Sequence, residues 1–126
     1  MTPLALRERQ LSPVVRPVLI VDSYRDEGEM YAEYLRSTGA FVEYVRTPEK
    51  ALPRLRSRPP AVIIADMVFQ GSNYDGPAFV HEVRALSTCA TTNCIIVSGV
   101  AHASSPPSGT TWLGCGTDMR DLRRAA

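Results

Sequence analysis

Lysine is almost absent from this chain of 126 residues. Of its 14 basic residues, only Lys50 is a lysine and the other 13 are arginines. A guanidinium differs from an ammonium group in shape, reach and acidity, so arginine does not simply replace lysine in a chemical site. Any chemistry that requires a lysine ammonium group therefore depends on this one residue.

A strong net charge and long hydrophobic runs are also lacking. The formal net charge is only +1, which excludes a strong basic field for nucleic acid or for an anionic membrane surface. No run of about 18 apolar residues occurs, and the first residues do not combine a basic start with an apolar stretch, as a secretory signal would. We therefore expect a soluble protein that binds no nucleic acid or membrane and is not exported.

Cysteine is scarce too, and its number is odd. The chain contains Cys89, Cys94 and Cys115, which do not make up a disulfide framework in a chain of ordinary size. Cys89 and Cys94 have no histidine or second cysteine pair beside them, so the sequence favours buried thiols over metal ligands. A cytoplasmic location is the corresponding expectation.

The remaining composition is that of an ordinary globular domain. Hydrophobic residues make up 44% of the chain and charged residues 21%, and a chain of this length corresponds to one domain. Residues 1–16 contain prolines and arginines but little hydrophobic periodicity, which predicts an N-terminal arm. The folded domain is predicted over residues 17–126.

Short apolar runs alternate with amphipathic segments along this domain. Helices are predicted in three of the intervals, with Ser23 and Thr47 as candidate N-caps and Pro77 opening the third helix. The predicted strands are residues 18–21, 41–45, 61–66, 94–97 and 110–115. Three of these strands are apolar on both faces, as in a buried parallel sheet. The predicted fold class is α/β, with a flavodoxin-like, doubly wound sheet of five parallel strands.

The stretch after Ser98 is less regular. Residues 101–111 contain two prolines and many small polar residues, so the fourth helix region should be shortened or irregular. Thr117 is a candidate cap for a short final helix.

Polar residues stand at the ends of three predicted strands: Asp22, Asp66 and Ser98. Because ligands of open parallel sheets bind at the carboxyl ends of the strands, we expect these three residues to meet. Two carboxylates there suit Mg²⁺, and a carboxylate beside the metal can act as a nucleophile toward a phosphoryl group. Ser98 would donate a hydrogen bond to that group, and Gly99 would leave room for its oxygens.

Four stretches of the chain, VLIVDS, PPAVIIADM, DG and IIVSG, together resemble the receiver domain of two-component response regulators. The resemblance covers about residues 17–100. It implies that Asp66 accepts a phosphoryl group from a histidine kinase or a histidine phosphotransfer protein. It also implies that Mg²⁺ binds Asp22, Asp66 and the backbone carbonyl of Val68, and that Ser98 senses the phosphoryl group.

The sequence departs from this pattern beside both aspartates. The family has a second acid where this chain has Ser23, and the loss of a carboxylate weakens Mg²⁺ binding. Asp26 or Glu27 could supply the missing acid, and Ser23 is explained more simply as a helix N-cap. The loop after Asp66 is about two residues longer than usual, with Gln70 at a place where proline is common.

A third departure concerns the lysine that ends the fifth strand in this family. The only lysine here, Lys50, lies in the second predicted helix, so that role is vacant. Arg120 or Arg25 are the candidate substitutes, although a guanidinium has a different reach and geometry.

Two functions stay open at this point. The first is a stand-alone receiver-like domain of a two-component phosphorelay, a signalling phosphoprotein rather than an enzyme, which passes its signal to a downstream protein partner. The second is a pseudo-receiver that acts by phosphorylation-independent protein contact, which the missing lysine and acid favour. A small nucleotide-binding enzyme is disfavoured because no GxGxxG or Walker sequence is present. Whether the protein forms a homodimer is left open.

Overall fold

The structure, a computed structural model of the chain, describes residues 17–98 and 110–114. Several predictions therefore lie outside the described residues. They are the N-terminal arm, the irregular region that begins at Gly99, Cys115, and the final helix with Arg120. Within the described ranges, no helix is long and apolar enough to cross a membrane.

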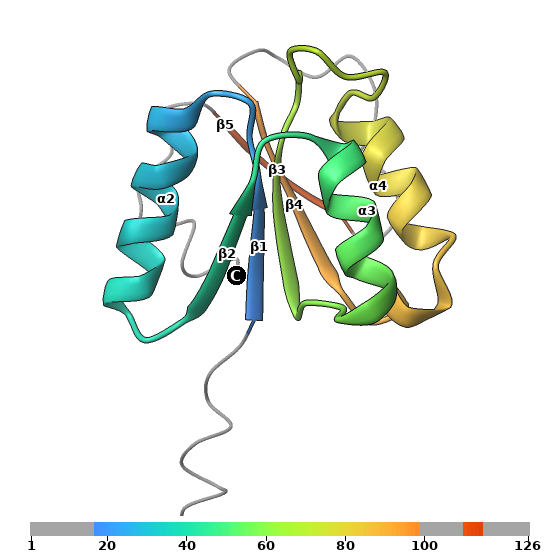
Figure 1. Cartoon of the computed structure of the whole chain (residues 1–126), viewed down its shortest axis with the longest axis horizontal. Coiled ribbons are helices and arrows are strands. Elements are labelled where there is room, and N and C mark those ends of the chain that lie inside the picture. Colours follow the sequence, from blue (N-terminus) through green and yellow to red (C-terminus); the bar gives the residue numbers. More distant parts are fainter. Residues whose placement is uncertain (1–16, 99–109, 115–126) are drawn as a thin grey trace, which may run out of the picture.

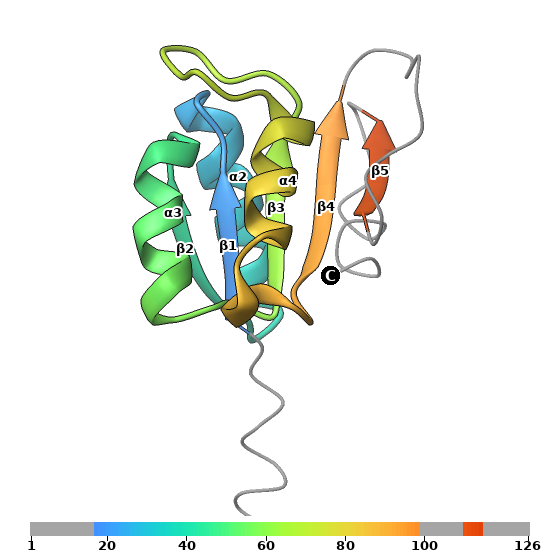
Figure 2. The same cartoon turned by 90° about the vertical axis from the view of Figure 1, so that its right-hand side faces the viewer.

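Five parallel strands form one sheet in the order β2-β1-β3-β4-β5. They are β1 (Pro17–Val21), β2 (Phe41–Val45), β3 (Val62–Asp66), β4 (Asn93–Ser98) and β5 (Thr110–Gly114). Figure 2 shows the arrowheads of β1, β4 and β5 pointing to the same edge of the sheet. The predicted α/β class and the five-stranded parallel sheet are confirmed.

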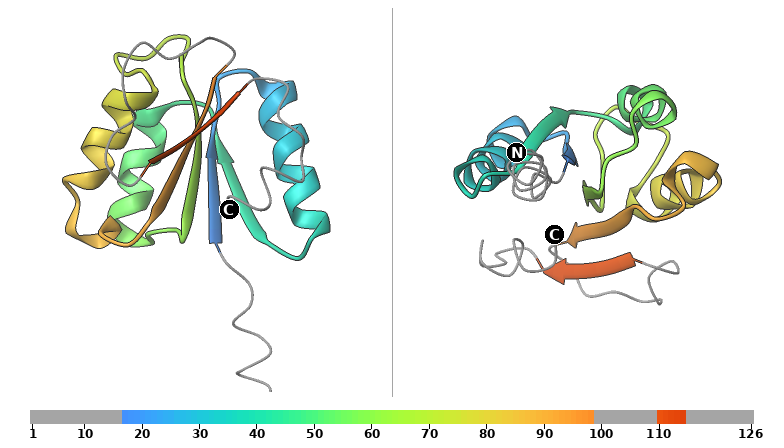
Figure 3. Two further views of the ribbon diagram at one scale, coloured as in Figure 1. Left: turned by 180° about the vertical axis from the view of Figure 1, so that it is seen from behind. Right: turned by 90° about the horizontal axis from the view of Figure 1, so that it is seen from below.

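Helices cover both faces of this sheet. Among the described residues, α2 (Arg25–Ser37) lies on one face, and α3 (Pro48–Ser57) and α4 (Gly76–Arg84) lie on the other (Figures 1 and 3). A short 3-10 helix, η2 (Ser87–Cys89), precedes β4. The result is a three-layer arrangement in which every described helix connects two parallel strands.

The strand β1 shows why the central strands are apolar throughout. Leu19 and Val21 belong to the hydrophobic cluster shared with α3 and α4, whereas Val18 and Ile20 belong to the cluster shared with α2. Successive side chains of a strand point to opposite faces, so a strand covered on both sides needs an apolar residue at every position. This burial fixes β1 in the sheet and places Asp22 at its carboxyl end.

Two helices begin with side-chain caps, of which Thr47 is predicted from the sequence and Asp75 is not. Thr47 Oγ1 accepts a hydrogen bond from the backbone N–H of Lys50 at 3.3 Å, at the start of α3. Asp75 Oδ1 accepts one from the backbone N–H of Ala78 at 2.8 Å, at the start of α4. Such caps satisfy N–H groups that have no partner inside the helix. The Asp75 cap also marks the end of the loop that follows β3.

Candidate functional site

Three carboxylates meet at the carboxyl edge of the sheet. Asp22 follows β1 directly, Asp66 is the last residue of β3, and Glu27 lies in the first turn of α2. One carboxylate oxygen from each lies within 4.8 Å of those from the other two. We call these three residues the acid cluster. The structure thus brings together the two aspartates predicted from the sequence and adds Glu27 to them.

The acid cluster concentrates negative charge in a poorly solvated place. Asp22 is only 2% exposed, and its pKa rises to about 8, mainly through burial and then through a hydrogen bond with Glu27. The charges of Glu27 and Asp66 raise it further, and the backbone N–H of Tyr24, which donates to Asp22 Oδ1 at 2.8 Å, opposes the rise. Carboxylates packed this closely do not all stay ionised without a compensating proton or cation.

Asp66 stands in a similar environment. Burial raises the pKa of its carboxyl group, and the charge of Glu27 adds to this. Two backbone N–H groups work in the opposite direction. That of Met67 donates to Asp66 Oδ1 at 2.8 Å, and the second is that of Val68. The start of the loop after β3 therefore orients the Asp66 carboxylate.

Ser23 is not the N-cap that its position suggested. The N-cap of α2 is Tyr24, which makes no side-chain capping bond. Ser23 is 4% exposed, and its Oγ accepts a hydrogen bond from the backbone N–H of Gln70 at 3.1 Å. The physical reason for the difference is that the helix starts one residue later, which leaves the Ser23 hydroxyl directed at the loop after β3.

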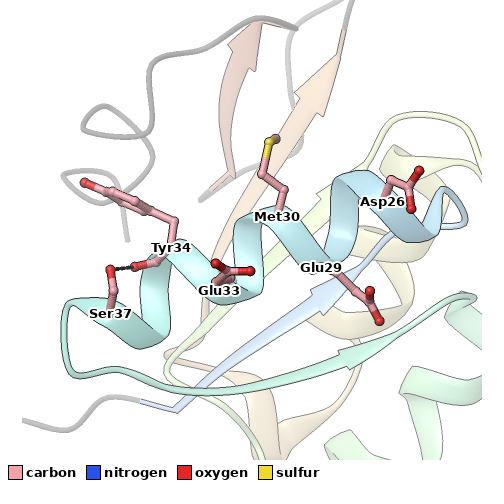
Figure 4. A pocket seen from close by; sticks show the side chains of 6 residues that line it. All are labelled: Asp26, Glu29, Met30, Glu33, Tyr34 and Ser37. Atoms are coloured by element: carbon pink, nitrogen blue, oxygen red, sulfur yellow. Dashed lines mark hydrogen bonds between the residues drawn. The ribbon is translucent and has the colours of Figure 1, made fainter.

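The two acids considered as substitutes for the missing one point in different directions. Glu27 joins the acid cluster, whereas Asp26 lines an open hollow on the outer side of α2, together with Met30, Tyr34 and other residues of that helix (Figure 4). With Tyr24 as N-cap, Glu27 occupies N3, the position from which an acidic side chain reaches back toward the helix start. Once Tyr24 is known to be the N-cap, this rule predicts that Glu27 rather than Asp26 turns toward the start of the helix.

The loop at residues 67–75, here the β3–α4 loop, is held at several points. The side-chain amide of Gln70 donates to the Tyr24 hydroxyl at 3.3 Å. On the other side, the Glu49 carboxylate of α3 accepts hydrogen bonds from Ser72 Oγ at 2.7 Å and from the backbone N–H of Asn73 at 3.1 Å. These bonds lower the pKa of Glu49. No local sequence pattern predicts these bonds, because the partners come from separate elements.

Gly76 explains the Asp-Gly pair at the end of this loop. Its N–H donates to the carbonyl of Met67 at 2.7 Å. A Cβ atom at this position would lie 2.7 Å from the backbone oxygen of Asp66 and 3.1 Å from the Met67 Cα. Only glycine allows α4 to approach the end of β3 this closely. The Asp-Gly pair thus positions the backbone of Asp66 itself.

Two other predicted site residues, Val68 and Ser98, belong to the segments at the ends of β3 and β4. Val68 pairs with Asp75 in an isolated antiparallel bridge. Ser98 ends β4, one residue beyond Val97, which pairs with Asp66, but its side chain is outside the described part. Gly99 is also outside it.

Of the two arginines considered as substitutes for the family lysine, the structure describes only Arg25. Arg25 is exposed and pairs with Glu29, at 3.7 Å between Nε and Oε1. Lys50 is exposed near the start of α3, and Arg120 lies outside the described residues. The charged side chains that act on the pKa of Asp22 in the described ranges are both carboxylates.

Comparison with known proteins places this geometry in a fold family. No protein-family model matches the chain, and no curated protein matches its sequence. Among solved structures, the receiver domain of the hybrid histidine kinase CckA is 23% identical with a TM-score of 0.72, over 86% of this chain and 93% of that one. The chemotaxis response regulator CheY4 of Vibrio cholerae is 23% identical with a TM-score of 0.76, over 89% and 99%.

A third match is the receiver domain of NtrX from Brucella abortus. It is 21% identical with a TM-score of 0.74, and the comparison covers 86% of this chain and 96% of that domain. At such identities the likeness concerns the path of the chain rather than its chemistry. The acid cluster lies at the carboxyl edge of a sheet whose order and connections these proteins share. The chain has the fold of a response-regulator receiver domain.

Proposed function

We propose that this chain is a receiver-like signalling domain of a two-component phosphorelay and that Asp66 accepts a phosphoryl group. The observation that carries the proposal is the acid cluster at the end of β1 and β3, in a chain with the receiver fold. The phosphoryl donor would be a phosphohistidine of a histidine kinase or of a histidine phosphotransfer protein. A downstream protein partner would read the result.

The transfer itself requires an ionised Asp66. One carboxylate oxygen forms a bond to phosphorus while the bond between phosphorus and the donor's imidazole nitrogen breaks, and that nitrogen keeps the electron pair. The Met67 N–H holds Oδ1 of Asp66, which orients the carboxylate for attack. Ser98, at the end of the neighbouring strand, and Gly99 would receive the transferred oxygens.

The acid cluster has the composition of a Mg²⁺ site. All three donors are carboxylate oxygens, which this hard cation prefers. Burial, with the charges of neighbouring carboxylates adding to it, raises the pKa of Asp22 and Asp66, and a bound divalent cation would favour their ionised forms. Asp22, Asp66 and the carbonyl of Val68 would bind the metal, with Glu27 replacing the acid absent at Ser23. The metal would supply charge neutralisation for the transferred phosphoryl group.

Phosphorylation by a small donor tests this function. The full chain is incubated with acetyl phosphate and Mg²⁺, and intact mass is measured. We expect a gain of one phosphoryl group that Asp66→Asn abolishes and that Asp26→Asn, a matched change of an exposed acid outside the acid cluster, leaves in place. A wild-type chain without any mass gain, and without a Mg²⁺-dependent spectral response to beryllofluoride, would contradict the proposal.

The alternative is a pseudo-receiver that signals through protein contact without phosphate. The place of Lys50 in the chain favours it, because the only lysine is exposed in α3 and none stands at the end of the fifth strand, where the resemblance requires one. Its signature would be an unmodified Asp66 in the same experiment and, in thermal unfolding, a stability that millimolar Mg²⁺ leaves unchanged.

A further inference from the structure

The two departures from the receiver pattern beside the aspartates are in contact with each other. The Ser23 hydroxyl, at the position of the missing acid, accepts the N–H of Gln70, at the position where proline is common. Proline has no backbone N–H, so this bond requires both an acceptor at position 23 and a residue other than proline at position 70. We call it the Ser23–Gln70 bond.

This bond joins the two chain segments that carry the proposed metal ligands. Ser23 lies between Asp22 and Tyr24, whose N–H holds the Asp22 carboxylate. Gln70 lies in the β3–α4 loop, which begins with Met67, whose N–H holds the Asp66 carboxylate. A displacement of one segment relative to the other would therefore move one carboxylate relative to the other.

Burial makes the bond a strong constraint. Ser23 is 4% exposed, so water does not readily replace a lost partner, and an unpaired buried hydroxyl is costly. The Glu49 contacts with Ser72 and Asn73 hold the other half of the loop to α3, away from the acid cluster. The Ser23–Gln70 bond is thus the described contact that ties the loop to the segment after Asp22 through a buried side chain.

We propose that Ser23 is a positioning residue whose hydroxyl, through the N–H of Gln70, sets the separation of the Asp22 and Asp66 carboxylates and so the affinity of the acid cluster for a divalent cation. The inference rests on the proposed function in one respect, the binding of the cation. Ser23 itself touches no reacting atom. Residues that orient metal ligands without binding the metal commonly change affinity by about 10- to 100-fold when they are removed.

The first experiment removes the acceptor. Mn²⁺ binding to the full chain is measured by electron paramagnetic resonance for wild type, Ser23→Ala and Ser23→Thr. We expect Ser23→Ala to weaken binding by about tenfold and Ser23→Thr, which keeps a hydroxyl, to restore most of it. Ser37→Ala removes an exposed hydroxyl at the far end of α2 and should leave the affinity unchanged. Ser23→Ala with an affinity within twofold of wild type would overturn the proposal.

The second experiment removes the donor. Gln70→Pro deletes the N–H, whereas Gln70→Ala keeps it and deletes only the side-chain contact with Tyr24. Gly71 follows with a φ of +70°, as in turns that accept proline at the preceding position. We expect Gln70→Pro to match Ser23→Ala, and the double variant to be no weaker than either single one. Additive losses in the double variant would contradict a shared bond.

A metal-free measurement separates this inference from the proposed function. The amide signals of Tyr24 and Met67 report the hydrogen bonds to the two carboxylates. In the presence of a chelator, Ser23→Ala and Gln70→Pro should shift both signals in the same way, and Gln70→Ala should not. If wild type binds no Mn²⁺ but these shifts occur, the metal site fails and the positioning role stands. If wild type binds Mn²⁺ and Ser23→Ala changes neither the Mn²⁺ affinity nor the amide signals, the positioning role is wrong and the metal site stands.

Discussion

The two segments that carry the aspartates are held in different ways. The β1–α2 turn, residues 22–24, is short. Its backbone carbonyls accept hydrogen bonds from a side chain of β2 and from the side chain of the residue that follows β2. The Tyr44 hydroxyl donates to the carbonyl of Asp22 at 2.6 Å, and the Arg46 guanidinium donates to that of Ser23 at 3.0 Å. The β3–α4 loop is held instead by side-chain acceptors, Ser23 and Glu49, that come from elements on either side of it.

This difference shows where the site depends on individual residues. Backbone carbonyls are present whatever the residue, so the turn keeps its acceptors under most substitutions within it. The loop loses one of the contacts that hold it when an acceptor side chain is replaced. We therefore expect the loop to be the half of the site whose position substitutions change most easily. The following predictions test this contrast, in order of decreasing effect.

The largest effect is expected at Gly76, where the loop ends. Gly76→Ala places a Cβ 2.7 Å from the carbonyl oxygen of Asp66, and backbone must move to accommodate it, which should destabilise the protein by about 2 to 3 kcal/mol. Gly71→Ala is the control, because its Cβ meets nothing within 4 Å and only the positive φ costs about 1 kcal/mol. Urea unfolding measures both. Equal losses would show that the close approach is unimportant.

An opposite effect is expected at Glu27 in the metal-free protein. At a pH above the raised pKa of Asp22, Glu27→Gln removes one of three clustered charges and should stabilise the chelator-treated protein by about 1 kcal/mol. It should also reduce the stabilisation that added Mg²⁺ gives. Thermal unfolding with chelator and with Mg²⁺ provides the measurement, with Asp26→Asn as the matched control. A destabilised metal-free variant would show that Glu27 supports the turn by means other than charge.

The turn itself is tested at Tyr44. Tyr44→Phe removes the bond to the carbonyl of Asp22 and should cost about 1 kcal/mol, with faster amide exchange at residues 22–24. Tyr34→Phe removes a hydroxyl beside the open hollow of α2 and should cost nothing measurable. If Tyr44→Phe perturbed the β3–α4 loop more than the turn, the two segments would not be held separately.

The smallest effect is expected at Glu49. This side chain is exposed, so Glu49→Gln should change the free energy of unfolding by less than about 0.5 kcal/mol. The N–H of Asn73, which donates to Glu49, should nevertheless exchange faster with solvent. An unchanged exchange rate there would mean that α3 does not hold this half of the loop.

Much of the fold can be predicted from the sequence, because burial requires apolar residues in a recognisable pattern. A strand covered on both faces must be apolar at every position, and the runs ending at Val21, Ala65 and Val97 show this. Alternation of such runs with helical patterns led to the parallel sheet. The convergence of Asp22 and Asp66 followed in turn from the sheet, because parallel strands present their carboxyl ends at one edge.

The remaining parts of the site correspond to no recognisable pattern in the sequence. The start of α2 at Arg25 rather than one residue earlier decides that Glu27 joins the acid cluster and that Ser23 faces the loop. A shift of one residue is within the ordinary uncertainty of helix ends. The contacts of Gln70 and of Glu49 join residues 47 and 24 positions apart, and no local pattern indicates such pairs.

The two buried cysteines allow the rate at which the core opens to be measured by thiol labelling. Cys89 and Cys94 are free and fully buried, and burial raises the pKa of the Cys94 thiol to about 11. A fully buried side chain is out of reach of a reagent in solution, and for Cys94 the thiolate that reacts rapidly with electrophiles is also disfavoured, so both thiols should be inert until the core around η2 and β4 opens. In a background with Cys115→Ser, the rate of labelling by a maleimide would then report how often this core opens.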